Sequence, residues 1–219
     1  GWTQQTVENS VDEWLSEHPE VTTTVQDGSL TFHKFVVGTL GYVTPEMYGA
    51  KGDGVTDDSA AIRRMIENSE DGTTFYFGGK TYLVDYPEKN ERKDFYYSPF
   101  DIYKRKDLTL VFSNSTIKMK PNDNPDIYGG IVAITNSENI RVIGGKFIGT
   151  RDSYNVSNGN RRQYGIVTNA AKNISIMNVD VSSCVASCLH ISGSGDKHSD
   201  TVYVYNSKFY ESSYHGISL

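Results

Sequence analysis

A strand-like segment recurs about every 30 residues through the C-terminal half of this chain, and this period constrains the fold more than any other feature. One strand of the repeat contains apolar residues spaced 32, 34 and 28 positions apart, namely Leu108, Ile140, Ile174 and Val202. A second strand follows in each copy, at Ile117, Phe147, Val181 and Phe209. A third contains Ile131, Ile166, Leu189 and Ile217. Three short strands per repeat, joined by Gly, Asn and Ser turns, predict a solenoid.

Each repeat needs its neighbours, because a single coil cannot bury its inner face. Coils stacked ~4.8 Å apart pair every strand with the copy above and below it. The sequence therefore predicts an all-β protein, a right-handed parallel β-helix, whose hand follows the general chirality of parallel crossovers. Aligning the third strand by its glycines predicts an inward stack of Ile131, Ile166, Leu189 and Ile217. The same alignment predicts an outward column of Val132, Val167, His190 and Ser218.

A glycine-rich loop and an amphipathic helix precede the first coil. The segment YGAKGDGVTDDSAAIRRMIENS begins at Tyr48, and Thr56 is of a type that caps helix N-termini. The apolar residues after it repeat at helical spacing, namely Ala61, Ile62, Met65 and Ile66. An open solenoid end is an aggregation hazard, so we expect a helix at about 57–68 to cover the first coil.

Residues 1–44 form a separate N-terminal element, and residues 45–219 form the β-helix. Helical spacing of Val7, Val11, Trp14 and Leu15 predicts a short helix over 1–20, which at this length needs a packing partner. Alternating residues around Asp27-Gly28 predict a hairpin or extended arm over 21–47. The chain stops inside a strand, HGISL, and we expect the natural protein to continue beyond it.

Composition excludes several classes of partner. A net charge of −6 provides no general basic field for nucleic acid, and no apolar run approaches the ~20 residues that span a bilayer. Cys184 and Cys188 lack other ligands at metal spacing, so we interpret them as small buried hydrophobic residues. No glycine-rich loop is followed by the Lys-Ser/Thr of a phosphate-binding loop. We therefore expect neither a metal nor a cofactor.

The one acidic cluster in the repeats is the turn GSGDKHSD, which contains Asp196, His198 and Asp200. Two carboxylates on either side of a sugar can act as general acid and base when they lie ~5–9.5 Å apart. Polar turns more often carry such residues because the turn is solvated. Both interpretations stay open, with solvation favoured.

Two long insertions interrupt the coils, at 85–98 and 151–164. Both are polar and aromatic, and loops on a rigid scaffold commonly carry recognition. Their candidate contact residues are Phe95, Tyr96, Tyr97, Tyr154, Arg161, Arg162 and Tyr164. These side chains are suited to stacking on sugars and pairing with acidic groups, and equally suited to contacts between subunits.

YGAKGDGVTDDSAAI followed by FYFGGKTYLV resembles the start of the pectate lyase superfamily of β-helix proteins, which includes phage tailspikes and polysaccharide-cleaving glycosidases. The resemblance covers about residues 45–219. The upstream segment SVDEWLSEHPEVTTTVQDGSL is similar to N-terminal regions of phage tail fibre or tailspike proteins. The polygalacturonase-type catalytic motifs of the family are missing, and Tyr214-His215-Gly216 only half matches one of them.

The resemblance implies the N-terminal fragment of a homotrimeric phage tailspike or tail fibre protein. Its N-terminal element would attach to other tail proteins in the virion, and its β-helix would bind or depolymerise a bacterial surface polysaccharide. Any active site is expected outside this fragment. The alternative is a secreted, extracellular bacterial glycosidase or lyase of the same superfamily.

Overall fold

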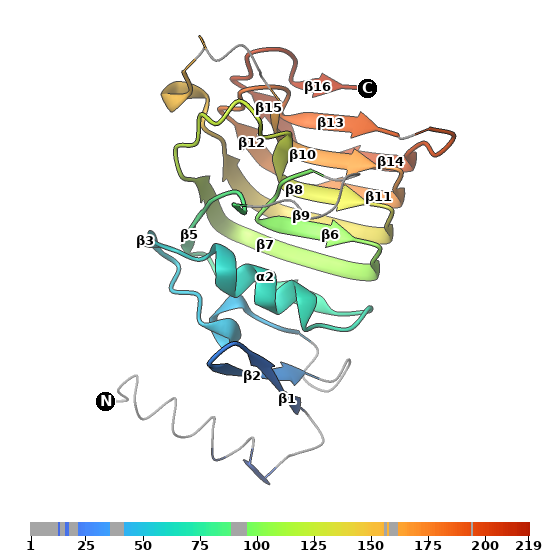
Figure 1. Cartoon of the computed structure of the whole chain (residues 1–219). Helices are drawn as coiled ribbons and strands as arrows, with labels where there is room; N and C mark the ends of the chain where they lie inside the picture. Colours follow the sequence, from blue (N-terminus) through green and yellow to red (C-terminus); the bar gives the residue numbers. More distant parts are fainter. Residues whose placement is uncertain are drawn as a thin grey trace.

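The computed structural model describes residues 13, 16–17, 22–35, 42–88, 96–155, 157, 162–193 and 195–219. From Val43 onward the chain winds into a parallel β-helix, which confirms the predicted fold (Figure 1). One sheet has five strands: β6 (Phe100–Tyr103), β8 (Gly129–Thr135), β10 (Gln163–Asn169), β13 (Leu189–Ser192) and β16 (Ile217–Ser218).

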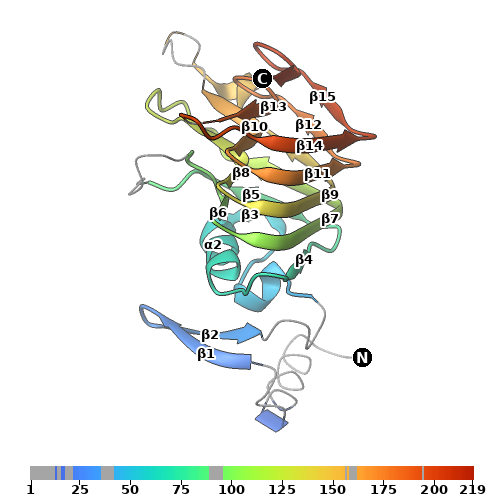
Figure 2. The ribbon, with the colours of Figure 1, turned by 90° about the vertical axis from the view of Figure 1, so that its right-hand side faces the viewer.

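The second sheet has nine strands. Its main path is β3 (Asp53–Asp57), β5 (Thr81–Val84), β7 (Lys106–Met119), β9 (Glu138–Ile148), β11 (Lys172–Met177) and β14 (Asp200–Tyr205). Beside it lie β4 (Thr74–Tyr76), β12 (Asp180–Ser182) and β15 (Lys208–Tyr210). Figure 2 shows β7, β9, β11 and β14 stacked in this order along the solenoid. Predicted stacks along this sheet are confirmed by the register that pairs Leu108, Ile140, Ile174 and Val202.

The register of the five-stranded sheet differs from the prediction by one residue. Ile166 pairs with Val132 instead of Ile131, because the backbone aligns Gly130 with Tyr164 and not with Gly165. The outward column is consequently Asp101, Ala133, Val167, His190 and Ser218, with Ala133 where Val132 was predicted. Strand β6, which contributes Asp101, was not predicted from the repeat.

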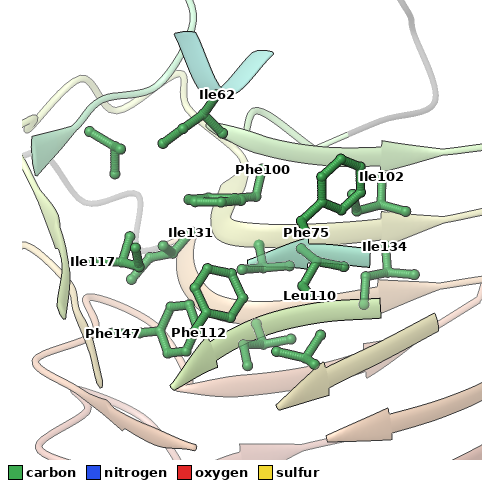
Figure 3. Packing of buried hydrophobic residues seen from close by; sticks show 14 of the residues in the cluster. Ile62, Phe75, Phe100, Ile102, Leu110, Phe112, Ile117, Ile131, Ile134 and Phe147 are labelled. Carbon is green, nitrogen blue, oxygen red and sulfur yellow. The ribbon is translucent and has the colours of Figure 1, made fainter. Parts of the chain in front are cut away.

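Aromatic rings fill the core of the first coils. Phe112 is fully buried, and its ring centroid lies 4.6 Å from that of Phe77, 5.4 Å from Phe100 and 4.8 Å from Phe147. Figure 3 shows Phe100 of one sheet beside Phe112 and Phe147 of the other, with Ile62 of the helix above them. Buried rings of this size make a large contribution to the hydrophobic stabilisation of this end of the solenoid.

A ladder of side chains fixes one corner of the coils. Asp107, Asn139 and Asn173 occupy equivalent positions and have left-handed backbones, with φ of 57°, 55° and 53°. The Asn139 Nδ2 donates to Asp107 Oδ1 at 2.9 Å, and the Asn173 Nδ2 donates to Asn139 Oδ1 at 2.5 Å. Asn and Asp tolerate this conformation better than other non-glycine residues, so the sequence specifies a sharp turn here.

Helix α2 (Ser59–Glu67) buries Ala61, Ile62, Met65 and Ile66, and covers the N-terminal end of the solenoid as predicted (Figure 1). It begins later than expected. Thr56 lies in β3 and the N-cap is Asp58, whose carboxylate accepts from the backbone N–H groups of Lys51 and Gly52. Asp58 thus ties the glycine-rich loop to the helix. The short 3-10 helix η2 (Pro45–Tyr48) packs beside it.

Strands β1 (Thr22–Asp27) and β2 (Leu30–Phe35) pair antiparallel around Gly28-Ser29, which confirms the predicted hairpin. The predicted helix over 1–20 lies outside the described residues, except for positions 13, 16 and 17. Within the described part of the chain, no helix combines the length and apolar character needed to cross a bilayer.

Candidate functional site

An aromatic ladder runs along the outer side of the five-stranded sheet. It consists of Tyr128, immediately before β8, Tyr164 of β10 and His190 of β13, so successive coils each contribute one ring. The Tyr164 and His190 rings are stacked, with centroids 4.4 Å apart and planes 12° apart. Tyr128 lies 5.9 Å from Tyr164 at an angle of 50°. Parallel stacking of the strands thus brings together rings that lie 36 and 26 residues apart in the sequence.

Tyr96 anchors the ladder from below. Tyr96 lies near the end of the 85–98 insertion, and its ring contacts Tyr128 edge to face with centroids 4.6 Å apart. The Tyr96 hydroxyl lies 2.9 Å from Ser192 Oγ and 3.3 Å from the Tyr128 hydroxyl. Tyr96 also covers the small outward residues Ala133 and Val167. Tyr96, near the end of the 85–98 insertion, therefore packs on this sheet and contacts the ladder.

Two further polar groups complete the ladder. The Nδ1 of His190 is hydrogen-bonded to Ser218 Oγ at 2.8 Å. The Arg162 guanidinium lies over the Tyr128 ring, 5.4 Å from its centroid, which is within cation–π distance. Arg162 is exposed, so a cation stands at the surface beside the exposed edge of Tyr128.

Burial controls the protonation of these groups. It raises the pKa of Tyr164 to about 12, and the neighbouring Tyr128 hydroxyl contributes to the increase. Burial likewise raises the pKa of Tyr96 and lowers that of His190. Burial therefore favours the neutral forms of Tyr164, Tyr96 and His190, close to the guanidinium of Arg162.

This arrangement is suited to hydrogen bonding from ring edges more than to stacking on a ring face. His190 covers one face of Tyr164, and Tyr128 of the preceding coil lies against the same residue from the other direction. Tyr128 is 37% exposed and Tyr214, on the coil that ends the chain, is 54% exposed. Rigid strands therefore hold hydroxyl groups and a guanidinium in fixed positions at this surface, where they are available to hydrogen-bond a polar group.

The other predicted aromatic contacts are placed differently. Tyr154 is 8% exposed and Tyr96 is 5% exposed, so burial leaves both rings little surface for a ligand. Tyr97 packs against the core while its backbone pairs with Gly129. Arg161 and Phe95 lie outside the described residues.

The acidic turn connects β13 to β14. Asp196 and His198 are exposed, and Asp200 is exposed at the first position of β14, paired with Lys172. Ser199 anchors the turn, because its hydroxyl donates to the Ser192 carbonyl at 2.7 Å. Among the described residues, no hydrogen bond or ion pair joins the three predicted side chains. They are consistent with a solvated turn.

The described residues contain no group of three or more His, Cys, Asp or Glu side chains placed to hold a metal ion. A divalent cation needs several carboxylate, imidazole or thiolate ligands converging on one point. The groups present at the aromatic ladder are hydroxyls, an imidazole and one guanidinium.

Sequence reasoning missed Tyr128 and treated His190 only as a surface residue. Tyr128 sits in a turn, PNDNPDIYGG, that gives no periodic signal. The signal that was available is the insertion at 151–164, which ends directly at Tyr164. A long insertion entering a strand marks the side of the solenoid on which unusual surface residues gather.

The described residues form a parallel β-helix with a helical N-terminal cap, which is the fold of a pectate lyase-like solenoid. Residues 45–217 match the family described as rhamnogalacturonase A/epimerase, pectate lyase-like, and the chain belongs to this family. Membership establishes the fold and lineage of this chain.

Similar proteins include a capsule K30/K69-specific depolymerase of Klebsiella phage K64-1, 49% identical over 41 residues, which are 19% of this chain and 5% of that protein. A capsule KN3-specific depolymerase of Klebsiella phage KN3-1 is 44% identical over 48 residues, 20% of this chain and 6% of that protein. The matches thus span a small part of both relatives.

A solved structure with a similar fold is the A-module of the mannuronan C-5 epimerase AlgE6 from Azotobacter vinelandii. It has a TM-score of 0.60 and 20% identity, covering 78% of this chain and 44% of that one. PfbA, a surface adhesin of Streptococcus pneumoniae, has a TM-score of 0.54 and 17% identity, covering 78% and 50%. An enzyme and an adhesin share this fold, so function depends on the surface residues.

Proposed function

We propose that this chain is the N-terminal part of a phage tailspike or tail fibre protein that recognises a bacterial surface polysaccharide. The observation that carries the proposal is the aromatic ladder of Tyr128, Tyr164 and His190 with Arg162 beside it. Similarity to two phage capsule depolymerases supports the origin of the protein and the class of ligand.

A polysaccharide fits the geometry of this face. Stacked coils repeat a hydrogen-bonding side chain at each level of the solenoid, and a sugar chain likewise repeats hydroxyl groups along its length. The Tyr128 edge, Arg162 and the more distant Tyr214 offer donors to successive sugars. Rigid strands hold these groups in place before binding, which lowers the entropy lost on association.

Recognition, rather than cleavage, is the activity that these residues support. A hydrolase needs two carboxylates facing one groove, and the aromatic ladder presents none. Asp196, His198 and Asp200 are the weak candidates for catalysis, and they lie on the β13–β14 turn. Replacing both Asp residues with Asn tests them, since unchanged cleavage of a bound polysaccharide would remove them from consideration.

Binding to an array of bacterial surface polysaccharides, including Klebsiella capsules K30 and K69, tests the proposal. We expect the wild-type chain to bind at least one glycan, and Tyr128→Ala and Arg162→Ala each to weaken that binding about tenfold. This corresponds to a loss of ~1.4 kcal/mol, typical of one hydrogen bond or cation–π contact. Tyr203→Ala is the matched control, because Tyr203 is 58% exposed on the other sheet.

Binding to no glycan on the array would overturn recognition by this chain. Equal weakening by Tyr203→Ala would show that the aromatic ladder is not the contact surface. Either result leaves the fold and the family assignment unaffected, because these rest on independent observations.

We further propose that residues 1–44 attach the protein to the virion and contribute to a homotrimer, while residues 45–219 form the recognition unit. The support is the apolar spacing of Val7, Val11, Trp14 and Leu15, which needs a packing partner, and the similarity to phage proteins. Sedimentation of the chain with and without residues 1–44 tests this role. A monomer in both cases would contradict it.

A further inference from the structure

Two cysteines lie in contact at the corner between β12 and β13. The Sγ atoms of Cys184 and Cys188 are 2.7 Å apart, and both residues are buried. A disulfide bond has an S–S distance of ~2.05 Å, so the two sulfurs are within about 0.6 Å of bonding separation. Both residues are free thiols in this structure.

Backbone hydrogen bonds from neighbouring coils hold the two sulfurs together. The Ser213 N–H donates to the Cys184 carbonyl at 3.1 Å, and the Cys188 N–H donates to the His215 carbonyl at 3.3 Å. Between them, the Ala186 N–H donates to the Gln163 carbonyl at 2.8 Å on the preceding coil. Separating the thiols would require breaking this ladder on both sides, so their proximity is a property of the stacked coils.

The two thiols are chemically different. Burial raises the pKa of Cys184, whereas hydrogen bonding from the Cys184 thiol lowers the pKa of Cys188, with a further contribution from the positive charge of Arg151. The thiolate is the reactive form of cysteine. Cys188 is therefore the group that attacks an oxidant, and Cys184 is the resolving thiol.

We propose that Cys184 and Cys188 form a reversible intrachain disulfide site. The oxidant is a peroxide, which is small enough to reach a buried pair during local opening. The Cys188 thiolate displaces hydroxide from hydrogen peroxide and becomes a sulfenic acid. Cys184 loses its proton and attacks that sulfur, which releases a second hydroxide as the S–S bond forms. Two thiols are oxidised, one peroxide is reduced, and two waters are the final products.

A disulfide between Cys184 and Cys188 would fix the backbone of the corner that leads directly into β13. His190 lies two residues beyond Cys188 and stacks on Tyr164, so the cross-link would act on the backbone that positions the end of the aromatic ladder. Gly165 packs against the Cys188 carbonyl, where an added Cβ would approach to 2.2 Å, and so leaves the corner little room to shift. The inference concerns this cysteine pair and does not depend on the ligand of the ladder.

Counting thiols in the full chain tests the proposal. The purified protein is treated with a small excess of hydrogen peroxide, unfolded in denaturant and titrated with a chromogenic thiol reagent. We expect the reactive thiols per chain to fall from two to none, the mass to fall by two hydrogens, and dithiothreitol to restore both thiols. Cys184→Ser and Cys188→Ser are the matched controls, and each should form no intrachain disulfide.

Three results would overturn the proposal: two thiols that still react after oxidation, loss of thiols that dithiothreitol does not reverse, or disulfide-linked dimers on a non-reducing gel. Because the key measurement uses the wild-type chain, it stands even if a serine variant folds poorly. Circular dichroism before and after oxidation verifies that the β-helix is retained in the oxidised sample.

Discussion

Arg105 provides the sharpest test of how the capping helix is held to the solenoid. This residue lies in the turn between β6 and β7, and its side chain is 17% exposed. Its Nη1 donates to the Ile66 carbonyl at 2.7 Å and its Nη2 donates to the Ser69 carbonyl at 2.5 Å. The guanidinium thus satisfies carbonyls at the C-terminal end of α2, where the helix dipole favours a cation.

The cost of Arg105→Met follows from these contacts. Methionine keeps the apolar stem but removes two charge-assisted hydrogen bonds, each worth ~1.5 kcal/mol, so we expect a loss of about 3 kcal/mol. The 2.8 Å ion pair with Asp71 adds little, because Asp71 is half exposed. A loss of this size lowers the melting temperature by ~6–12 °C for a domain of this length.

Thermal unfolding and hydrogen exchange together measure this effect. We expect α2 amides to exchange about 100-fold faster in Arg105→Met, since the helix would detach locally before the coils unfold. The matched control is Arg63→Met on the exposed side of the same helix, where the pair with Glu67 is 4.0 Å long and should be worth under ~0.5 kcal/mol. Arg105→Met with wild-type stability, or equal damage from Arg63→Met, would refute the reasoning.

Three further predictions follow from the packing. Phe112→Ala should cost ~3–5 kcal/mol in chemical unfolding, because it removes the ring that contacts Phe77, Phe100 and Phe147, whereas Phe112→Leu should cost less than half as much. Burial lowers the pKa of His190, so on acidification the imidazole binds a proton in the unfolded state before it does so in the folded state. The free energy of unfolding should therefore fall as the pH drops below about 6.5. In His190→Gln this fall should be smaller. Reducing a disulfide between Cys184 and Cys188 should lower the free energy of unfolding by ~2 kcal/mol, because the loop that it closes is short. A lower melting temperature measures this loss.

The inner faces of the solenoid were predictable because they obey a simple period. Apolar residues recur at equivalent positions in each coil, and the observed register along β7, β9, β11 and β14 matches that pattern. The error at β8 has a physical origin. Glycines at 130 and 165 look equivalent in sequence, but Gly130 pairs with Tyr164. The register follows the buried apolar residues, because Val132 pairs with Ile166.

The aromatic ladder was less predictable, because its members do not share one repeat position. Tyr164 pairs with Gly130, while Tyr128 precedes β8 by one residue and His190 belongs to the adjacent outward column. Their rings meet through side-chain length and the bending of the strands at the corner. The sequence period aligns equivalent positions of successive coils, so it does not predict contacts between side chains that lie at non-equivalent positions.

The two outer faces of this solenoid also differ in a way that favours a role for the ladder. On the nine-stranded sheet, one outward column alternates charge from coil to coil through Lys106, Glu138, Lys172 and Asp200, which is sufficient to keep a β-helix surface solvated. On the five-stranded sheet, the equivalent surface carries Ala133 and Val167, and Tyr96 and Tyr164 pack over them. Solubility alone does not require that Tyr96 and Tyr164 pack over the apolar residues Ala133 and Val167. Apolar residues at these positions let the tyrosine rings pack closely on the sheet and hold them in fixed positions along the solenoid. Recognition of a repeating polymer needs aromatic side chains in fixed positions of this kind.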